Sequence, residues 1–258
     1  MAGRTQGGSR SLLARVSKVL GAFTEDETEL SAARIAAHTG LARTTNYRLL
    51  AELVEFGLLA RTAAGRYVIG TRLWELGELS PLSVRLRETA LPFLQRLYEF
   101  GGENVHLGVL DGEDPAVAEA LYVARLTGPA SVPTLSRMGS RHPLHTTGVG
   151  KALLMTRDEQ WLSEYLAKHL ERETVYSVTD AQRLRAEIAE SRARGYATTR
   201  QEMTLGSASI AAPVPPVDGL APAALGVVTH LALSDERGLG ALVVRTARDL
   251  ADALAKIH

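Results

Sequence analysis

The 258-residue sequence contains no cysteine, which excludes disulfide bonds and thiolate metal sites. It also lacks any uncharged apolar run of about eighteen residues, so no segment is expected to cross a membrane. Its first residues show neither the apolar core nor the cleavage site of a signal peptide. These absences predict a soluble cytoplasmic protein, and the 45% of apolar residues is enough for a substantial core.

The chain has no net charge, yet its charged residues are unevenly distributed. Residues 1–72 hold ten basic and six acidic side chains, a net charge of +4, whereas the remaining residues hold nineteen and twenty-three, a net charge of −4. This asymmetry is typical of a polyanion-binding module joined to a neutral or acidic domain. The length independently predicts two domains of unequal size.

The first part of the chain has the pattern of a helix-turn-helix module. Apolar residues recur at helical spacing over residues 11–23, and a second helix is expected to end at Gly40. A third helix begins two or three residues later and carries Leu49, Leu50 and Leu53 on one side. Two helices joined by a short turn that contains glycine are characteristic of DNA-binding helix-turn-helix proteins.

The polar side chains of the third helix gather in its first two turns, the part of a recognition helix that enters a major groove. Arginines bind phosphates or guanine edges, hydroxyls bind either, and the helix dipole favours a nearby phosphate. Two short strands, at 58–61 and 66–69, then predict the hairpin of a winged helix. The predicted DNA contacts are Arg34, Arg43, Thr44, Thr45, Tyr47, Arg48, Arg61 and Arg66. An ordinary solvated helix face is the alternative for the third helix, and a solvated strand residue is the alternative for Arg66.

The rest of the sequence predicts a connector and an α+β domain. A short helix starts near Thr71, and a longer one covers 82–100, with Pro92 expected to kink it or mark a restart. Such a connector can join two domains and also supply a dimer contact. Beyond residue 104, runs of strands interrupted by helix pairs are typical of a sheet with helices packed on it. The predicted domains are 1–72, a linker at 73–100, and 101–258.

Three ordered motifs resemble the IclR family of bacterial transcriptional regulators. The segment HPLHTTGVGKALLM (142–155) is close to the family pattern Pro-Leu-His-x-Thr-Ala-x-Gly-Lys-Ala-Leu-Leu. The stretch RGYATTRQEMTLGSASIAAPV (194–214) is similar to a second family signature, and AALGVV (223–228) follows at the expected distance. With the N-terminal module, the resemblance covers nearly the whole chain.

The resemblance implies a dimeric or tetrameric regulator with a winged helix on operator DNA and a GAF-like effector-binding domain. It implies no cofactor and no enzymatic activity, and we expect a repressor. The family positions that bind small carboxylates correspond here to a loop at Gly148 and Val149, to Thr199 in place of an aspartate, to Ser209 in place of a cysteine, and to Gly226 and Val228 in place of two serines. A buried anion that lacks such partners is costly. We therefore expect an effector larger or less polar than glyoxylate or pyruvate, such as an aromatic compound.

Other interpretations fit the residues less well. The GVGKA stretch lacks the first glycine and the Ser or Thr of a phosphate-binding loop, so Lys151 is expected either to start a helix or to cover the pocket mouth. His142 and His145 flank a proline and have no third metal ligand at a suitable spacing. A hydrolase would pair Ser209 with a histidine, but no nucleophile elbow is present. The remaining alternative is a hydrolase or metal-binding sensor that uses the winged helix only for dimerisation.

Overall fold

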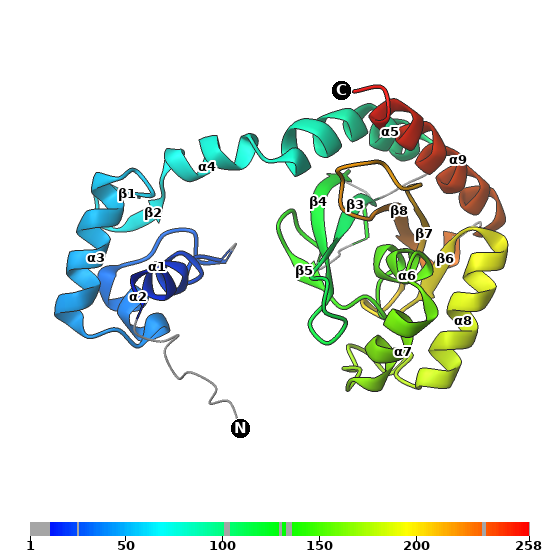
Figure 1. Cartoon of the computed structure of the whole chain (residues 1–258), viewed down its shortest axis with the longest axis horizontal. Coiled ribbons are helices and arrows are strands. Elements are labelled where there is room, and N and C mark those ends of the chain that lie inside the picture. The colour runs from blue at the N-terminus through cyan, green and yellow to red at the C-terminus, as the bar shows by residue number, and fades with distance from the viewer. Residues whose placement is uncertain are drawn as a thin grey trace. The chain divides into compact units, whose positions relative to one another are not determined.

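The computed structural model describes residues 11–24, 26–100, 104–128, 131–132, 136–233 and 236–257 (Figure 1). The chain divides into two compact units, residues 1–80 and residues 81–258. The three-part division expected from the sequence, with 73–100 as a separate linker, stays a prediction. In the described part of the chain, no helix has the length and apolar character needed to span a bilayer.

The first unit is a winged helix-turn-helix, as predicted. Its elements are α1 (Leu12–Leu20), α2 (Ala32–Thr39), α3 (Arg43–Glu55), β1 (Leu59–Arg61), β2 (Tyr67–Ile69) and α4 (Thr71–Glu78). Helix α2 starts at Ser31, whose hydroxyl accepts the amide of Arg34, and ends at Gly40 in the left-handed conformation (φ 66°). A side chain at Gly40 would disfavour that conformation, so the glycine allows the turn into α3.

The wing is an antiparallel hairpin in which Leu59 pairs with Ile69. Leu30 adds a short third strand segment, because its backbone exchanges two hydrogen bonds with Tyr67 (2.9 and 2.8 Å). Leu30, Leu59 and Tyr67 are buried in the small core that also holds the apolar side of α3. The hairpin is therefore fixed to the helices by both hydrogen bonds and burial.

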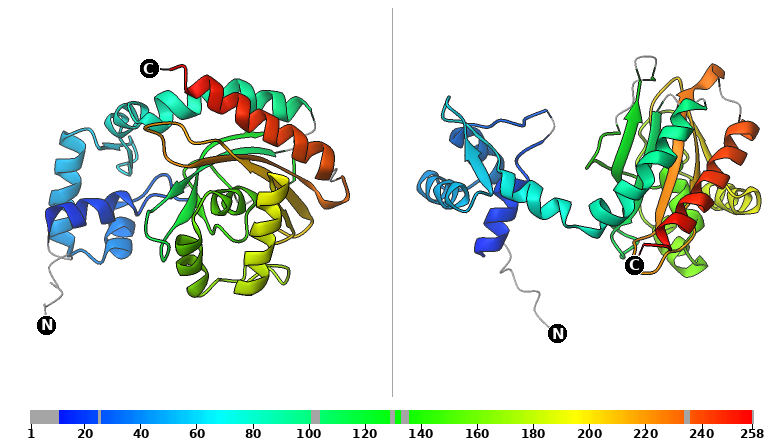
Figure 2. Two further views of the ribbon diagram at one scale, coloured as in Figure 1. Left: turned by 45° about the vertical axis from the view of Figure 1, so that its right-hand side comes forward. Right: turned by 90° about the horizontal axis from the view of Figure 1, so that it is seen from above.

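The second unit is built on a six-stranded antiparallel sheet with the order β5-β4-β3-β8-β7-β6. The strands are β3 (Asn104–Asp111), β4 (Glu119–Thr127), β5 (Arg141–His142), β6 (Ala197–Arg200), β7 (Ser207–Pro213) and β8 (Ala223–His230). Helices α5 (Glu88–Glu99) and α9 (Glu236–Leu254) lie side by side on one face, as Figures 1 and 2 show. Helix α6 (Gly148–Met155) packs on the other face, together with α7 (Glu159–Ala167) and α8 (Ala181–Arg194).

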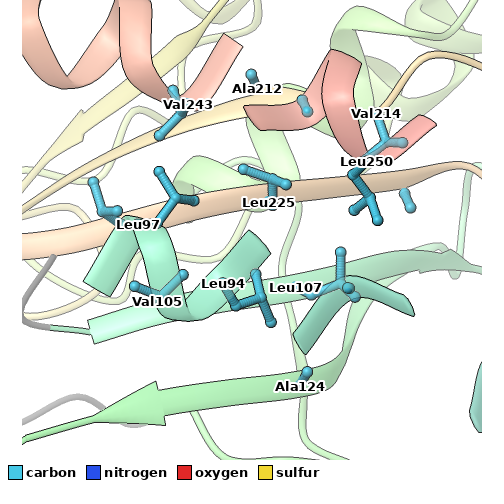
Figure 3. Close-up of a cluster of buried hydrophobic side chains, with 14 of the residues drawn as sticks. Leu94, Leu97, Val105, Leu107, Ala124, Ala212, Val214, Leu225, Val243 and Leu250 are labelled. Carbon is cyan, nitrogen blue, oxygen red and sulfur yellow. The ribbon is translucent and has the colours of Figure 1, made fainter. Parts of the chain in front are cut away.

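Alternation along β3 assigns its side chains to the two faces of the sheet. Val105 and Leu107 point to the α5 and α9 side, where they join the cluster drawn in Figure 3 with Leu94, Leu225 and Val243. The intervening residues of β3 face α6 instead, because successive side chains of a strand point to opposite faces. Both faces are covered, and every residue from Asn104 to Val109 is buried.

The structure corrects two expectations about local structure. The helix predicted over 82–100 is a π-helix (Leu82–Arg87) followed by α5, and Pro92 lies inside α5. The π-helix ends before the proline, where the amide of Glu88 donates to the carbonyl of Ser83, five residues back. The Gly148 segment, expected as a loop, is instead the first turn of α6.

Candidate functional site

The start of α3 presents an exposed polar surface. Arg43, Thr44, Tyr47 and Arg48 are exposed, and Thr45 is partly buried. Asn46 is fully buried, and its Nδ2 donates to the carbonyl of Ala32 at 2.8 Å, which fixes the rotation of α3 against α2. The N-cap residue of α3 is an alanine without a side-chain acceptor, so the first-turn amides remain available to an anion.

Two arginines on this surface differ in their partners. The guanidinium of Arg43 lies over the ring of Tyr47, 5.8 Å from its centroid, and forms no ion pair with any carboxylate that the structure describes. Arg48 forms a loose, exposed pair with Glu52 at 3.7 Å. Exposed pairs of this kind contribute little, so Arg48 is free to exchange Glu52 for a phosphate. Arg61, on the hairpin, donates to a carbonyl within its own turn at 3.3 Å.

Arg34 and Arg66 are more closely tied to acids of their own unit. Arg34 Nε lies 2.9 Å from Glu27 Oε1, and hydrogen bonding from Arg34 lowers the pKa of Glu27. Arg66 Nη2 donates to the carbonyl of Glu29 at 2.7 Å, and its Nε lies 3.6 Å from the Glu29 carboxylate. These contacts offset part of both charges, so the two arginines are weaker candidates for phosphate binding than Arg43.

A pocket lies between the first turn of α6 and the sheet, and its cavity volume is about 30 Å³. All six positions carried over from the family lie in its lining: Gly148, Val149, Thr199, Ser209, Gly226 and Val228. His106, Tyr122, Met203 and Thr204 are further lining residues that the sequence analysis did not identify. This volume is about that of one water molecule and lies below the range of about 300 to 1,000 Å³ that is typical of small-molecule sites, so an effector requires the lining side chains to move apart.

Two glycines allow the close approach of backbones around this pocket. A Cβ atom at position 148 would lie 2.5 Å from Ser209 Oγ, and one at position 226 would lie 2.6 Å from the Cβ of Ala211. Both distances are too short for nonbonded atoms. Glycine at these two positions therefore permits α6 and the neighbouring strands to pack as tightly as they do.

The first turn of α6 offers hydrogen-bond donors to the pocket. Thr147 is the N-cap, and its hydroxyl accepts the amide of Gly150 at 3.0 Å. The amides of Gly148 and Val149 have no acceptor within the helix. Together with the positive end of the helix dipole, they form a suitable site for a carboxylate.

Thr199 and Ser209 provide the hydroxyl groups of the pocket. The two hydroxyls hydrogen-bond each other across β6 and β7. Since one proton is used in that bond, the other hydroxyl proton remains available to a ligand. The pair thus supplies a single donor where the family pattern has an aspartate and a cysteine.

His106 is a buried polar group in the pocket lining. Its side chain is 1% exposed and packs edge-on against Tyr122 (5.2 Å between ring centroids). Its Nε2 has no hydrogen-bond partner among the residues that the structure describes. Burial, with the nearby charge of Arg125, lowers the pKa of His106 to about 3, so the imidazole is neutral. Burial also raises the pKa of Tyr122 to about 12, which keeps the phenol protonated.

Lys151 does not cover the pocket mouth, so that part of the sequence interpretation is wrong. Its side chain is 1% exposed, and its Nζ lies 2.8 Å from carboxylate oxygens of both Glu187 and Glu202. Burial raises the pKa of Glu202, against the opposing effect of Lys151. The lysine therefore joins α6 to α8 and to the turn between β6 and β7.

His145, one of the histidines considered for metal or hydrolase chemistry, is held by other hydrogen bonds. His145 Nε2 donates to the carbonyl of Glu171 (2.8 Å), which leaves Nδ1 to accept from the Tyr165 hydroxyl (3.1 Å). Ser209, the candidate nucleophile, is bonded to Thr199 and not to a histidine. Among the described residues, no group of three or more His, Cys, Asp and Glu side chains is arranged to hold a metal ion.

Comparison with known proteins decides the family. Residues 82–256 match the model described as "Bacterial transcriptional regulator IclR C-terminal", and residues 12–63 match the IclR helix-turn-helix domain. The chain belongs to the IclR family. The HTH-type transcriptional regulator XynR of Escherichia coli is 32% identical over 203 residues, which cover 78% of each chain. The Pca regulon regulatory protein of Pseudomonas putida is 32% identical over 85% of this chain and 74% of its own length.

A solved IclR homologue gives a close structural match. The homologue from Microbacterium hydrocarbonoxydans, in complex with 4-hydroxybenzoate, is 31% identical with a TM-score of 0.87, covering 95% of this chain and 99% of the homologue. The protein is thus a DNA-binding transcriptional regulator with an effector-binding C-terminal domain, and not an enzyme. The IclR-family assignment confirms the predicted fold class.

The buried His106 predicts a specific pH dependence of stability. Below pH 6.5 the unfolded chain protonates this imidazole, whereas the folded protein does not until about pH 3. Stability is therefore lost as the pH falls through this window, by about 1.4 kcal/mol per pH unit for one proton. His106→Phe should remove this contribution and make the dependence shallower between pH 5.5 and pH 4.

The measurement is urea unfolding of the second unit, followed by Trp161 fluorescence in a Trp74→Phe background. Substituting the exposed His169 with Gln is the control, which should behave like the parent. Equal slopes for the parent and the His106→Phe variant would contradict a buried neutral His106.

Proposed function

We propose that this IclR-family regulator represses transcription in the cytoplasm by binding an operator with α3, and that an aromatic carboxylate in the α6 pocket sets its DNA affinity. The observation that carries the proposal is the convergence of all six family effector positions on one pocket. The exposed, basic start of α3 supplies the DNA-binding surface. A coupling free energy of roughly 1–3 kcal/mol between the two sites changes operator affinity about 5-fold to 150-fold.

The DNA contacts are assigned mainly to α3. Arg43, Thr44, Tyr47 and Arg48 share its exposed first two turns, and the free amides at its N-terminus donate hydrogen bonds to a phosphate. Thr45, Arg61, Arg34 and Arg66 are secondary contacts in this proposal. Arg34 and Arg66 contribute only after loosening their bonds to acids of the same unit.

Arg43→Ala or Arg48→Ala should weaken operator binding by roughly tenfold or more, because each removes an interaction with a phosphate or a base. If the arginine binds a phosphate, the slope of log affinity against log salt should also fall by about one. The measurement is a gel shift over a salt series, with DNA from upstream of the protein's own and neighbouring genes. Glu55→Gln, at the other end of α3, should leave binding nearly unchanged. Unaltered affinity of both arginine variants would exclude this surface.

The chemistry of the pocket favours an aromatic carboxylate. Its described lining includes no charged side chain, so the α6 amides and the helix dipole, and not a counter-ion, would stabilise an anion. The ring would lie among Tyr122, Val149, Met203 and Val228, which form apolar and aromatic walls. His106 and the Thr199–Ser209 pair offer hydrogen bonds to a polar substituent. The homologue solved with 4-hydroxybenzoate supports this class of effector.

4-Hydroxybenzoate should therefore bind with micromolar affinity in isothermal titration, whereas glyoxylate and pyruvate should not, because they cannot fill the apolar part of the pocket. Thr199→Val combined with Ser209→Ala should weaken binding several-fold, because the pair then supplies no hydroxyl donor. Micromolar binding of glyoxylate or pyruvate would contradict the proposed effector class. A panel of benzoates with and without a hydroxyl then tests the hydrogen-bonding role of His106.

The protein is further proposed to act as a homo-oligomer, a dimer or a tetramer, in which α4 contacts a second copy. No residue of α4 is buried. The large apolar side chains of Trp74, Leu76 and the adjoining Leu79 are 67%, 45% and 75% exposed. Large apolar side chains clustered on a surface helix mark an interaction site. A dimer also places two recognition helices on half-sites one helical turn, or a multiple of it, apart.

Trp74→Glu combined with Leu79→Glu should convert the oligomer into a smaller species and weaken operator binding, because both half-sites are then no longer bound together. Light scattering after size exclusion gives the mass, and the gel shift gives the affinity. Val175→Glu, which changes an exposed apolar residue of the second unit, is the control. An unchanged mass would exclude α4 as the interface.

A further inference from the structure

A turn between β6 and β7 covers part of the effector pocket. Met203 and Thr204 of this turn line the pocket, and Thr146 Oγ1 lies 3.5 Å from the sulfur of Met203. The turn begins at Gln201, which adopts a positive φ of 58° although it is not a glycine. A non-glycine residue persists in that conformation only where its surroundings hold it there. Residues 201–206, which we name the covering turn, are closed at this end by Gln201, whose Oε1 accepts the amide of Gly206 at 2.9 Å.

One set of contacts holds the backbone of the covering turn. Thr174 Oγ1 donates to the carbonyl of Gln201 at 2.6 Å, and Ser177 Oγ donates to the carbonyl of Glu202 at 2.7 Å. These hydroxyls belong to the segment between α7 and α8. They fix the start of the turn but do not connect it to α6, on which the proposed carboxylate site lies.

A buried ion pair makes that connection. Lys151 Nζ lies 2.8 Å from Glu202 Oε1, and the two side chains are 1% and 7% exposed. Lys151 belongs to the first turn of α6, three residues after Gly148. The pair thus joins the helix that offers the carboxylate donors to the turn that carries Met203 and Thr204. Glu202 Oε2 has no hydrogen-bond partner, and Lys151 is the only ion-pair partner of this carboxylate in the described part of the chain.

We propose that Lys151 and Glu202 are positioning residues of the effector site: their ion pair sets the distance between the α6 amides and the covering turn, and so determines how tightly an effector is enclosed. This inference rests on the proposed effector pocket. Neither residue touches the effector, because neither lies in the pocket lining. Loss of the pair should loosen the covering turn and speed the release of an effector.

The second carboxylate on Lys151 provides a matched control. Glu187, on α8, also lies 2.8 Å from Lys151 Nζ, but it does not belong to the covering turn. Glu202→Ala leaves Lys151 paired with Glu187, and Glu187→Ala leaves it paired with Glu202. Neither variant creates an unpaired buried charge, which is the strongly destabilising event. Glu202→Ala therefore removes the ion pair between α6 and the covering turn, whereas Glu187→Ala keeps it.

The experiment measures hydrogen exchange of residues 201–206 and titration of 4-hydroxybenzoate for the full-length protein and each variant. Glu202→Ala should speed exchange of the covering turn by about tenfold and weaken effector binding by a similar factor. Operator binding without effector should stay unchanged. Glu187→Ala should remain within about twofold of the parent in both measurements. Glu202→Gln should be intermediate, because its amide oxygen still accepts from Lys151 without the charge.

Equal effects of Glu202→Ala and Glu187→Ala, or unchanged exchange in Glu202→Ala, would overturn the positioning role. Should Glu202→Ala fail to fold, Glu202→Gln decides: faster exchange of the covering turn supports the proposal, and exchange at the parent rate overturns it. Exchange is measured without ligand, so it tests the ion pair even if the parent protein does not bind 4-hydroxybenzoate. Failure of the parent protein to bind 4-hydroxybenzoate would instead contradict the proposed effector class.

Discussion

The effector-binding unit depends on the close approach of the first turn of α6 to strands β7 and β8. Glycine at 148 and at 226 permits this approach, because a Cβ atom at either position would collide with Ser209 or Ala211. The helix can then begin at the sheet surface, with Thr147 as its cap and two amides directed at the space that remains. The pocket, its donors and its apolar walls all follow from that spacing.

The same helix determines where the charges of this unit lie. One turn of α6 separates Gly148 from Lys151, so the lysine is buried behind the pocket and not at its mouth. The carboxylates of Glu187 and Glu202 offset the charge of Lys151, and the described lining of the pocket contains no ionised side chain. An anionic effector therefore meets backbone dipoles in place of a counter-ion, and its apolar part contributes a large share of the affinity. This balance is the reason why the proposed effector is an aromatic acid and not a small, highly hydrated one.

Local features could be predicted from the sequence, but contacts between distant residues could not. The spacing of Leu49, Leu50 and Leu53 identified α3, and Gly40 identified the turn before it, because both signals depend on neighbouring residues. The pocket positions were found only through family motifs. The partners of Lys151 lie 36 and 51 positions away, so no local pattern indicated its burial.

Two other features of the structure, the bond of Arg66 and the position of His106, also depend on contacts between distant residues. The bond of Arg66 to the carbonyl of Glu29 depends on how the wing folds back on the strand segment at Leu30. His106 belongs to a strand that reads as buried, and a polar residue at an inward position was the one available signal of its role. The position of His106 in the pocket lining depends on the register of β3 against β8, which places it opposite Gly226.

The most direct test of the central claim is an amide NMR spectrum of the isotopically labelled protein during titration with 4-hydroxybenzoate. A carboxylate bound at the start of α6 forms hydrogen bonds to the amides of Gly148 and Val149. We predict that these two resonances move downfield more than any others in the effector-binding unit. Binding of the compound with both resonances unchanged would show that the carboxylate lies elsewhere, and would contradict this account of the pocket.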